Sequence, residues 1–102
     1  MGNTNRNRGF GFERELVNKA KAEGIEARRM WGSDGRSSGL PENVDVVLGE
    51  GEHIHVQCKR VKKLAERMKP DDNIHAQCFR EDRGETYVLI RLPDYLELLK
   101  GP

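Results

Sequence analysis

Apolar and polar residues alternate in the middle of the chain, which is the pattern of a β-strand with one buried face. Two such runs, residues 44–48 and 53–59, flank the glycine-containing stretch 49–52, and this arrangement predicts a tight antiparallel hairpin. The apolar positions assigned to one face of the hairpin are Val44, Val46, Leu48, Ile54, Val56 and Cys58. The other face should be mainly polar.

The two apolar rows also predict which hairpin residues lie opposite each other. A register that sets Leu48 opposite Ile54 places Asp45 opposite Gln57. Lys59 follows two residues later on the same polar row, so a carboxylate, an amide oxygen and an ammonium group are expected to share one patch. Such a patch suits a metal ion and a phosphate, although the polar face of a half-buried sheet is more often simply solvated.

Helical periodicity predicts a first helix over residues 10–23, which ends at Gly24. Its inward stripe consists of Leu16, Val17 and Ala20. One turn earlier this stripe reaches Glu13, and a carboxylate there is costly unless a cation or metal pairs with it. A slightly rotated stripe through Phe12 would leave Glu13 at the border instead, and periodicity alone favours neither arrangement.

The other expected elements are a strand at 25–30, a loop at 31–42, a short helix at 61–68, a hairpin of 74–79 and 85–92, and a last helix that Pro93 opens. The apolar face of the last helix is Leu92, Tyr95, Leu96 and Leu99. The succession predicts an α/β fold with a central mixed β-sheet flanked by helices, in the order α-β-β-β-α-β-β-α. Residues 10–102 are expected to form a single domain, and residues 1–9 a flexible basic arm.

Charge is unevenly distributed, although the net charge of the 102 residues is only +1. A dense basic segment contains Lys59, Arg60, Lys62, Lys63, Arg67 and Lys69. A charge run is usually a solvated face, but this one begins at the candidate site and suits a polyanion. No apolar stretch is long enough to span a membrane and no signal segment is evident, so a soluble, cytoplasmic protein is expected.

The two cysteines do not form a disulfide framework. His55 and Cys58 precede a similar pair, His75 and Cys78, in a spacing that superficially resembles a zinc site. Residues three apart on a strand face opposite sides, so His55 and Cys58 are not expected to chelate together. Cys58 is expected to be a small core residue.

The order of helix carboxylate, serine-containing loop, strand carboxylate and strand lysine resembles the PD-(D/E)XK nuclease superfamily, and within it the archaeal-type Holliday-junction resolvases. The residues that carry this resemblance lie between positions 9 and 60: Glu13-Arg14-Glu15-Leu16-Val17, Arg29, Gly32-Ser33, Asp45 and Gln57-Cys58-Lys59. The resemblance implies a restriction-endonuclease-like fold and a metal-dependent endonuclease, with no small-molecule cofactor.

It also implies roles for individual residues. The implied ligands of Mg²⁺ or Mn²⁺ are Glu13, Asp45, Gln57 and the backbone carbonyl of Cys58. Lys59 would orient water and stabilise charge on the phosphate, and Ser33 would support cleavage. The implied DNA contacts are Arg14, Arg29, Arg60, Lys62, Lys63, Arg67 and Lys69. Gln57 occupies a position where an acid is usual, and Glu42 in the preceding loop is an alternative source of that carboxylate.

The expected substrate is a four-way DNA junction, cut symmetrically by a homodimer that offers one site to each of two strands. Apolar residues beyond the expected core, namely Trp31, Leu40 and Leu98, suggest that the dimer interface uses the 31–42 loop, the last helix or both, with Ser33 near the seam. The alternatives are a nuclease of this superfamily that acts on flaps, nicks or duplex DNA, and a non-catalytic DNA-binding module with the same fold.

Overall fold

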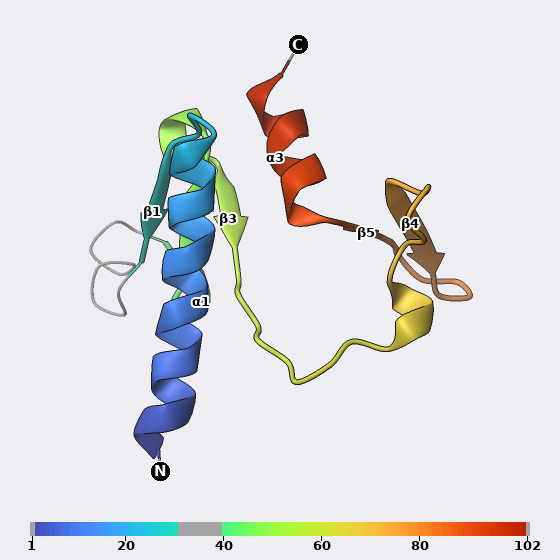
Figure 1. The fold of residues 1–102 in the computed structure, drawn as a ribbon, viewed down its shortest axis with the longest axis horizontal. Helices are drawn as coiled ribbons and strands as arrows, with labels where there is room; N and C mark the ends of the chain where they lie inside the picture. Colours follow the sequence, from blue (N-terminus) through green and yellow to red (C-terminus); the bar gives the residue numbers. More distant parts are fainter. Residues whose placement is uncertain (1, 31–39, 102) are drawn as a thin grey trace. The chain divides into compact units, whose positions relative to one another are not determined.

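The computed structural model describes residues 2–30 and 40–101, with side chains from residue 11 onward (Figure 1). Backbone contacts divide the chain into two compact units, Met1–Arg60 and Val61–Pro102. The described part of the first contains α1 (Gly2–Ala22), β1 (Ala27–Arg29), β2 (Val46–Leu48), the 3₁₀ turn η1 (Glu50–Glu52) and β3 (Ile54–Val56). The described part of the second unit contains the 3₁₀ turn η2 (Glu66–Met68), β4 (Ala76–Arg80), β5 (Thr86–Ile90) and α3 (Leu92–Lys100). The α/β class is confirmed, whereas a single domain with one central sheet stays a prediction.

Helix α1 begins at Gly2, and not near Phe10 as expected, so residues 2–9 are helical where an arm was predicted. This segment has no apolar face, but it also contains no proline that would interrupt the hydrogen-bond ladder. The end of the helix was predicted correctly. Gly24 adopts φ 79°, its N–H donates to Lys21 O at 2.9 Å, and Ile25 N–H donates to Ala20 O at 3.0 Å. These two bonds form a Schellman cap, which turns the chain into β1.

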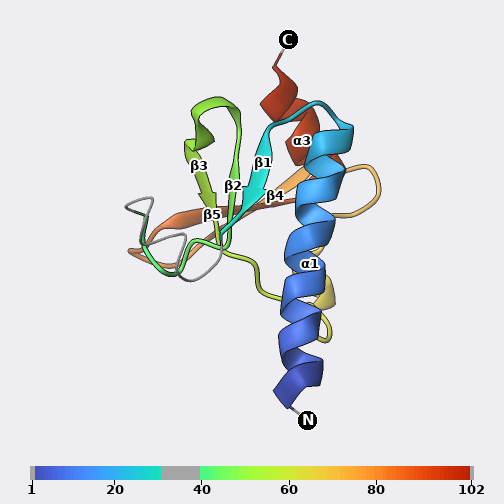
Figure 2. The ribbon, with the colours of Figure 1, turned by 90° about the vertical axis from the view of Figure 1, so that its left-hand side faces the viewer.

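The first unit contains an antiparallel sheet in the order β1-β2-β3, with β2 in the centre (Figure 2). The predicted register is confirmed, because Leu48 pairs with Ile54 and Val46 with Val56. Helix α1 packs against β1 and β2, and its residues Leu16, Val17 and Ala20 are buried as the stripe predicted. All three residues of β2 are buried, so both faces of the central strand are covered.

The face predicted for Val44 is wrong. Val44 does not share a row with Val46 and Leu48; it packs with Met30 and Val47, and Leu40 covers this cluster. Strict alternation of side chains holds only within a regular strand, and β2 begins two residues after Val44. Val47 is therefore buried against apolar neighbours. The sheet face that was expected to be mainly polar is covered by apolar residues at this position.

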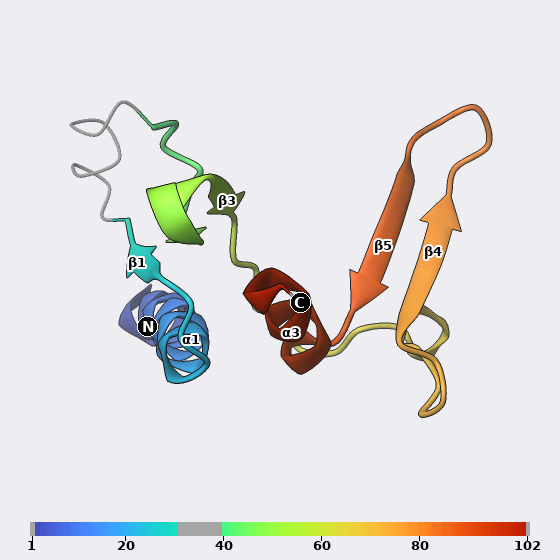
Figure 3. The same cartoon turned by 90° about the horizontal axis from the view of Figure 1, so that it is seen from above.

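In the second unit, the helix predicted at residues 61–68 is wrong, since the structure has only η2 within that range. Val61, Leu64 and Met68 have helical spacing, but Val61 is 56% and Leu64 40% exposed, and a helix this short is marginal in water unless its apolar face is buried. The predicted hairpin is confirmed: β4 pairs with β5, with Ala76 opposite Ile90 and Cys78 opposite Val88 (Figure 3).

Helix α3 is confirmed as well, with Pro93 in its first turn and Gly101 at its end. Leu96 is buried, Leu92, Tyr95 and Leu99 are half-buried, and Leu98 is exposed, as expected for a residue off the apolar stripe. Neither of the helices seen in the described ranges combines the length and apolar character that crossing a bilayer requires.

Candidate functional site

The backbone of Asp45 joins all three strands of the first unit, directly before β2 begins. Asp45 N–H donates to Val56 O at 2.9 Å, and Met30 N–H donates to Asp45 O at 2.8 Å. Because Val46 pairs with Val56, continuing the register by one residue sets Asp45 opposite Gln57, as the sequence predicted. The Asp45 carboxylate is therefore held at one end of the sheet by strands on both sides.

The Asp45 side chain has a fixed partner as well. The Cys58 backbone N–H donates a 2.8 Å hydrogen bond to Asp45 Oδ2 in a partly buried environment. A backbone donor restrains the carboxylate without neutralising its charge, and a carboxylate has further lone pairs with which to bind a cation. The chain just beyond β3 thus orients the acid that precedes β2.

Glu13 lies on the inward side of α1, so the structure favours the stripe that includes it. Its side chain is 13% exposed, and its Oε2 lies 3.7 Å from Nε of Arg29, which is also 13% exposed. Burial, and then the negative charge of Asp45, raise the pKa of Glu13 above its usual range, while the Arg29 guanidinium opposes this shift. We call Glu13 and Asp45 the acidic pair, because each carboxylate lies in the field of the other.

Cys58 completes this cluster. Burial, and then the negative charges of Asp45 and Glu13, raise the pKa of the Cys58 thiol to about 11. Both members of the acidic pair therefore act on one half-buried thiol, which stays protonated at neutral pH. Because the thiolate is the reactive form of cysteine, a protonated Cys58 is a poor nucleophile, and the residue enters the candidate site through its backbone N–H.

Gln57 and Lys59 lie on either side of Cys58 along the chain, and both are exposed. Strand β3 ends at Val56, so these residues follow the strand and do not belong to it, in contrast to the predicted strand through Lys59. Glu42, the alternative carboxylate, is also exposed. Ser33 lies outside the described residues.

The candidate DNA contacts divide into two groups. Six of them are exposed and accessible to a polyanion: Arg14, Arg60, Lys62, Lys63, Arg67 and Lys69. Arg29 is the exception, since it is largely buried and its guanidinium faces Glu13. The sequence placed Arg29 near the site but did not show that it is a neighbour of Glu13, because no local pattern links residues on a helix and a strand.

The chemistry of the site fits a hard divalent cation. Within residues 2–30 and 40–101, no three His, Cys, Asp or Glu side chains are close enough to form a metal cage by themselves. The donors expected from the sequence are instead two carboxylates, one amide oxygen and one backbone carbonyl, and Mg²⁺ typically binds through few carboxylates while it retains several waters. A cation between Glu13 and Asp45 would also offset the burial and the repulsion from Asp45 that together raise the pKa of Glu13.

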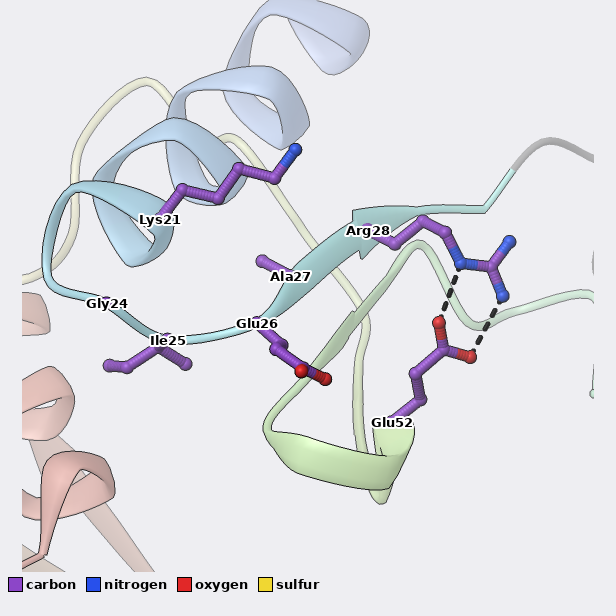
Figure 4. A pocket seen from close by; sticks show the side chains of 7 residues that line it. All are labelled: Lys21, Gly24, Ile25, Glu26, Ala27, Arg28 and Glu52. Carbon is purple, nitrogen blue, oxygen red and sulfur yellow. Dashed lines mark hydrogen bonds and ion pairs between the residues drawn. The ribbon is translucent and has the colours of Figure 1, made fainter.

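A cavity of about 430 Å³ lies elsewhere in the first unit, beside the turn that joins α1 to β1 (Figure 4). It is lined by Lys21, Gly24, Ile25, Glu26, Ala27, Arg28 and Glu52. Arg28 donates to both carboxylate oxygens of Glu52, at 2.7 and 2.9 Å, and these bonds lower the pKa of Glu52. None of the lining residues belongs to the acidic pair, so this cavity is separate from the candidate site.

The described elements and this site define a small α/β protein with two neighbouring carboxylates, Glu13 and Asp45, at one end of a sheet, and an exposed lysine, Lys59, directly after Cys58 in the chain. The family model of the archaeal Holliday junction resolvases matches residues 4–100, and the chain belongs to that family. Membership implies a DNA-binding nuclease of the junction-resolving type, whose substrate is branched DNA and which, as a family, depends on divalent metal. Searches of curated proteins and of solved structures found no significant match.

Proposed function

We propose that the protein resolves four-way DNA junctions by paired, symmetric hydrolysis of phosphodiester bonds, with Mg²⁺ or Mn²⁺ as the required ion. The observation that carries this proposal is the acidic pair: a largely buried Glu13 whose pKa is raised by burial and by Asp45. A buried carboxylate beside a second one is destabilising by itself, and in a nuclease family this arrangement supports a cation site.

In this proposal each residue has a separate task. Asp45 and Glu13 bind the cation, with the Gln57 amide oxygen and the Cys58 carbonyl as further ligands. When bound, the cation polarises the scissile phosphate and lowers the pKa of attacking water. The Cys58 N–H fixes Asp45 and Arg29 holds Glu13, while Lys59 stabilises negative charge on the phosphate. Ser33 is proposed to support cleavage from the preceding loop.

Affinity for DNA is assigned to exposed basic residues and not to the acidic pair. Arg14 lies on α1 next to Glu13, and Arg60 follows Lys59. The other contacts are proposed for Lys62, Lys63, Arg67 and Lys69. These contacts are with phosphates, so they fix the position of the DNA without reading its sequence.

The finer features of the assembly are part of the same proposal. Residues 10–102 would act as one nuclease domain of restriction-endonuclease-like fold, and two copies would form a homodimer that cuts two strands. The cytoplasm is proposed as the place of action, and no small-molecule cofactor is required.

The test uses end-labelled four-way junction, flap, nicked and linear duplex DNA, each with Mg²⁺, with Mn²⁺ and with EDTA. The expected result is cleavage of the junction at symmetric positions, dependent on the metal, with much slower cleavage of linear duplex. Faster cleavage of flaps or nicks would assign the protein to another substrate. Tight junction binding with no cleavage under any condition would show a non-catalytic binding module, the alternative that Gln57 in place of an acid raises and that the presence of Glu13, Asp45 and Lys59 together opposes.

A further inference from the structure

Arg91 in the second unit binds three backbone carbonyls at once. Its Nη1 donates to Ile74 O at 3.0 Å, and its Nη2 donates to Pro70 O at 2.7 Å and to Asp71 O at 3.0 Å. The planar guanidinium presents several N–H donors in a fixed geometry, which a lysine ammonium cannot reproduce. Arg91 therefore fixes the path of the chain between residues 70 and 74.

Gln77 holds the preceding residues in the same way. Its Nε2 donates to Arg67 O at 2.7 Å, and its own strand β4 is paired with β5 at Leu89. Arg91 directly follows β5, and its carbonyl accepts the first hydrogen bond of α3, from Tyr95 N–H at 3.0 Å. The side chains of Gln77 and Arg91 therefore extend from the β4–β5 hairpin and from the residue directly after it. They anchor the preceding chain, between residues 67 and 74, to that hairpin.

The segment held by these two residues is residues 65–74, which we call the 65–74 segment; it contains two basic residues, Arg67 and Lys69, and three acidic ones, Glu66, Asp71 and Asp72. It has local turns, with Met68 N–H donating to Ala65 O at 2.9 Å and Ile74 N–H donating to Asp71 O at 2.9 Å. The side chains of Arg67 and Lys69 are exposed, and Lys69 Nζ lies 3.1 Å from Glu66 Oε1 in a surface ion pair that a phosphate contact would replace. The sequence suggested a helix for residues 61–68, but the chain there contains only the turn η2, and side chains of Gln77 and Arg91 bind the carbonyls of Arg67, Pro70, Asp71 and Ile74.

We propose that Arg91 is a positioning residue for DNA binding: it holds the 65–74 segment so that Arg67 and Lys69 meet the phosphates of the substrate. This inference rests on the proposed function, since it assumes that Arg67 and Lys69 of the 65–74 segment contact DNA. Arg91 acts through its carbonyl contacts and does not itself touch DNA. Fixing the 65–74 segment before binding lowers the conformational entropy that the two phosphate contacts would otherwise cost.

The test measures junction affinity as a function of salt, with the full chain and with Ca²⁺ in place of Mg²⁺. Replacing Arg67 and Lys69 together by alanine should lower the slope of log affinity against log salt by about 2, roughly 0.9 for each phosphate contact. Arg91→Lys retains the positive charge but loses the planar set of N–H donors that binds the carbonyls, and it should lower this slope by about 1 or more. Adding Arg91→Lys to the double alanine variant should not lower the slope any further.

Arg80→Lys is the matched control, because Arg80 is an exposed arginine on the same hairpin. It should leave the slope unchanged. Hydrogen exchange without DNA gives a second readout: amides of the 65–74 segment should exchange faster in Arg91→Lys than in Arg80→Lys. If Arg91→Lys does not fold, Gln77→Ala should lower the slope in the same direction, because it releases the Arg67 carbonyl.

An unchanged slope in the Arg91→Lys and Gln77→Ala variants would overturn the inference and leave the proposed function intact. A further loss of slope when Arg91→Lys is added to the double alanine variant would also overturn it, because Arg91 would then bind DNA independently. Wild-type protein that binds no DNA would overturn the proposed function, and this inference with it.

Discussion

At the scale of single residues, the site is defined by a carboxylate that its surroundings disfavour. Glu13 is largely buried beside Asp45, and Arg29 offsets only part of the resulting cost, since the pKa of Glu13 is still raised. We propose that a bound divalent cation is what stabilises this charge. Perturbed carboxylates of this kind often lie at functional sites, where binding of the ligand stabilises them.

Asp45→Asn should separate cleavage from binding. The substitution removes the charge that would bind the cation, while the amide oxygen can still accept the hydrogen bond of the Cys58 N–H. We expect junction cleavage in Mg²⁺ to fall by at least roughly 100-fold and junction affinity to change little, because basic residues provide the affinity. Gel-based cleavage and binding assays measure both, with exposed Glu50→Gln as the control. Cleavage at the wild-type rate would contradict the assignment of Asp45.

Gln57→Glu should restore the acid that is usual at this position. A third carboxylate strengthens attraction for a divalent cation, so we expect cleavage to persist and the metal concentration for half-maximal activity to fall. A titration of Mg²⁺ against the initial cleavage rate measures this shift. Complete loss of activity, with metal binding intact, would show that Gln57 has a role that a carboxylate cannot fill.

Glu13→Gln should reveal the cost of the buried charge. The pKa of Glu13 is raised above 4.5 in the folded state, so the folded state holds this proton more tightly than the unfolded state. In EDTA, the contribution of Glu13 to stability should therefore decrease as pH rises from 4.5 through the raised pKa. The Glu13→Gln variant should not show this decrease. The Tm of the variant minus the Tm of the wild type should therefore increase across that pH range.

Thermal unfolding in EDTA at a series of pH values measures the difference. Glu15→Gln is the control, since Glu15 lies on the same helix but is exposed. Saturating Mg²⁺ should raise the Tm of the wild type more than that of Glu13→Gln, because the ion binds the folded state through that carboxylate. A Tm difference between the variant and the wild type that is independent of pH would contradict the assigned environment of Glu13.

At the scale of elements, β2 determines where the site residues lie. It pairs with both β1 and β3, and it is buried on both faces. Asp45 directly precedes it, while Arg29 and Cys58 come from the two flanking strands and the chain that follows them. Any loosening of β2 would therefore disturb the acidic pair as well as the core.

Leu48→Ala tests this dependence. Leu48 is 1% exposed, so the substitution leaves a cavity in the core of the first unit and should cost roughly 2–5 kcal/mol in the free energy of unfolding. Urea unfolding followed by circular dichroism measures the loss. His55→Ala, at an exposed position of β3, should change stability by no more than about 0.5 kcal/mol. Similar effects of the two substitutions would contradict the central place of β2.

At the scale of the whole molecule, the open question is how one small chain would make two cuts. Two-fold dimers are the commonest way to double a site. Of the apolar residues expected at the interface, Leu40 instead covers the cluster of Met30, Val44 and Val47, while Leu98 on α3 is 69% exposed. Trp31 lies outside the described residues. Leu98 is therefore the described residue on which the proposed interface can be tested.

Light scattering at micromolar concentration should show a dimer for the wild type, and Leu98→Glu should shift it towards monomer by placing a charge in the interface. Glu97→Gln, at the neighbouring exposed position, should leave the dimer unchanged. A strict monomer that still cuts both strands of a junction in one binding event would contradict the proposed mechanism. A monomer that makes single nicks would favour the flap or nick reading.

The sequence by itself determined the features that follow from local periodicity. The strand period of two predicted the β2–β3 register, the helical period predicted the buried stripe of α1, and glycine and proline marked the ends of α1 and α3. It also supplied the order of carboxylates and lysine that resembles the family to which the chain belongs.

Only the tertiary structure decided which of these groups touch one another. The Cys58 N–H bound to Asp45, the position of Arg29 against Glu13 and the packing of Val44 with Met30 each join segments that are distant in sequence. Residues 61–68 are another case. A helix was expected there, but the segment contains only η2, and the Arg67 carbonyl accepts a hydrogen bond from the side chain of Gln77 in β4. Such contacts depend on how the elements pack together, and the pattern of a single segment contains no information about its distant neighbours.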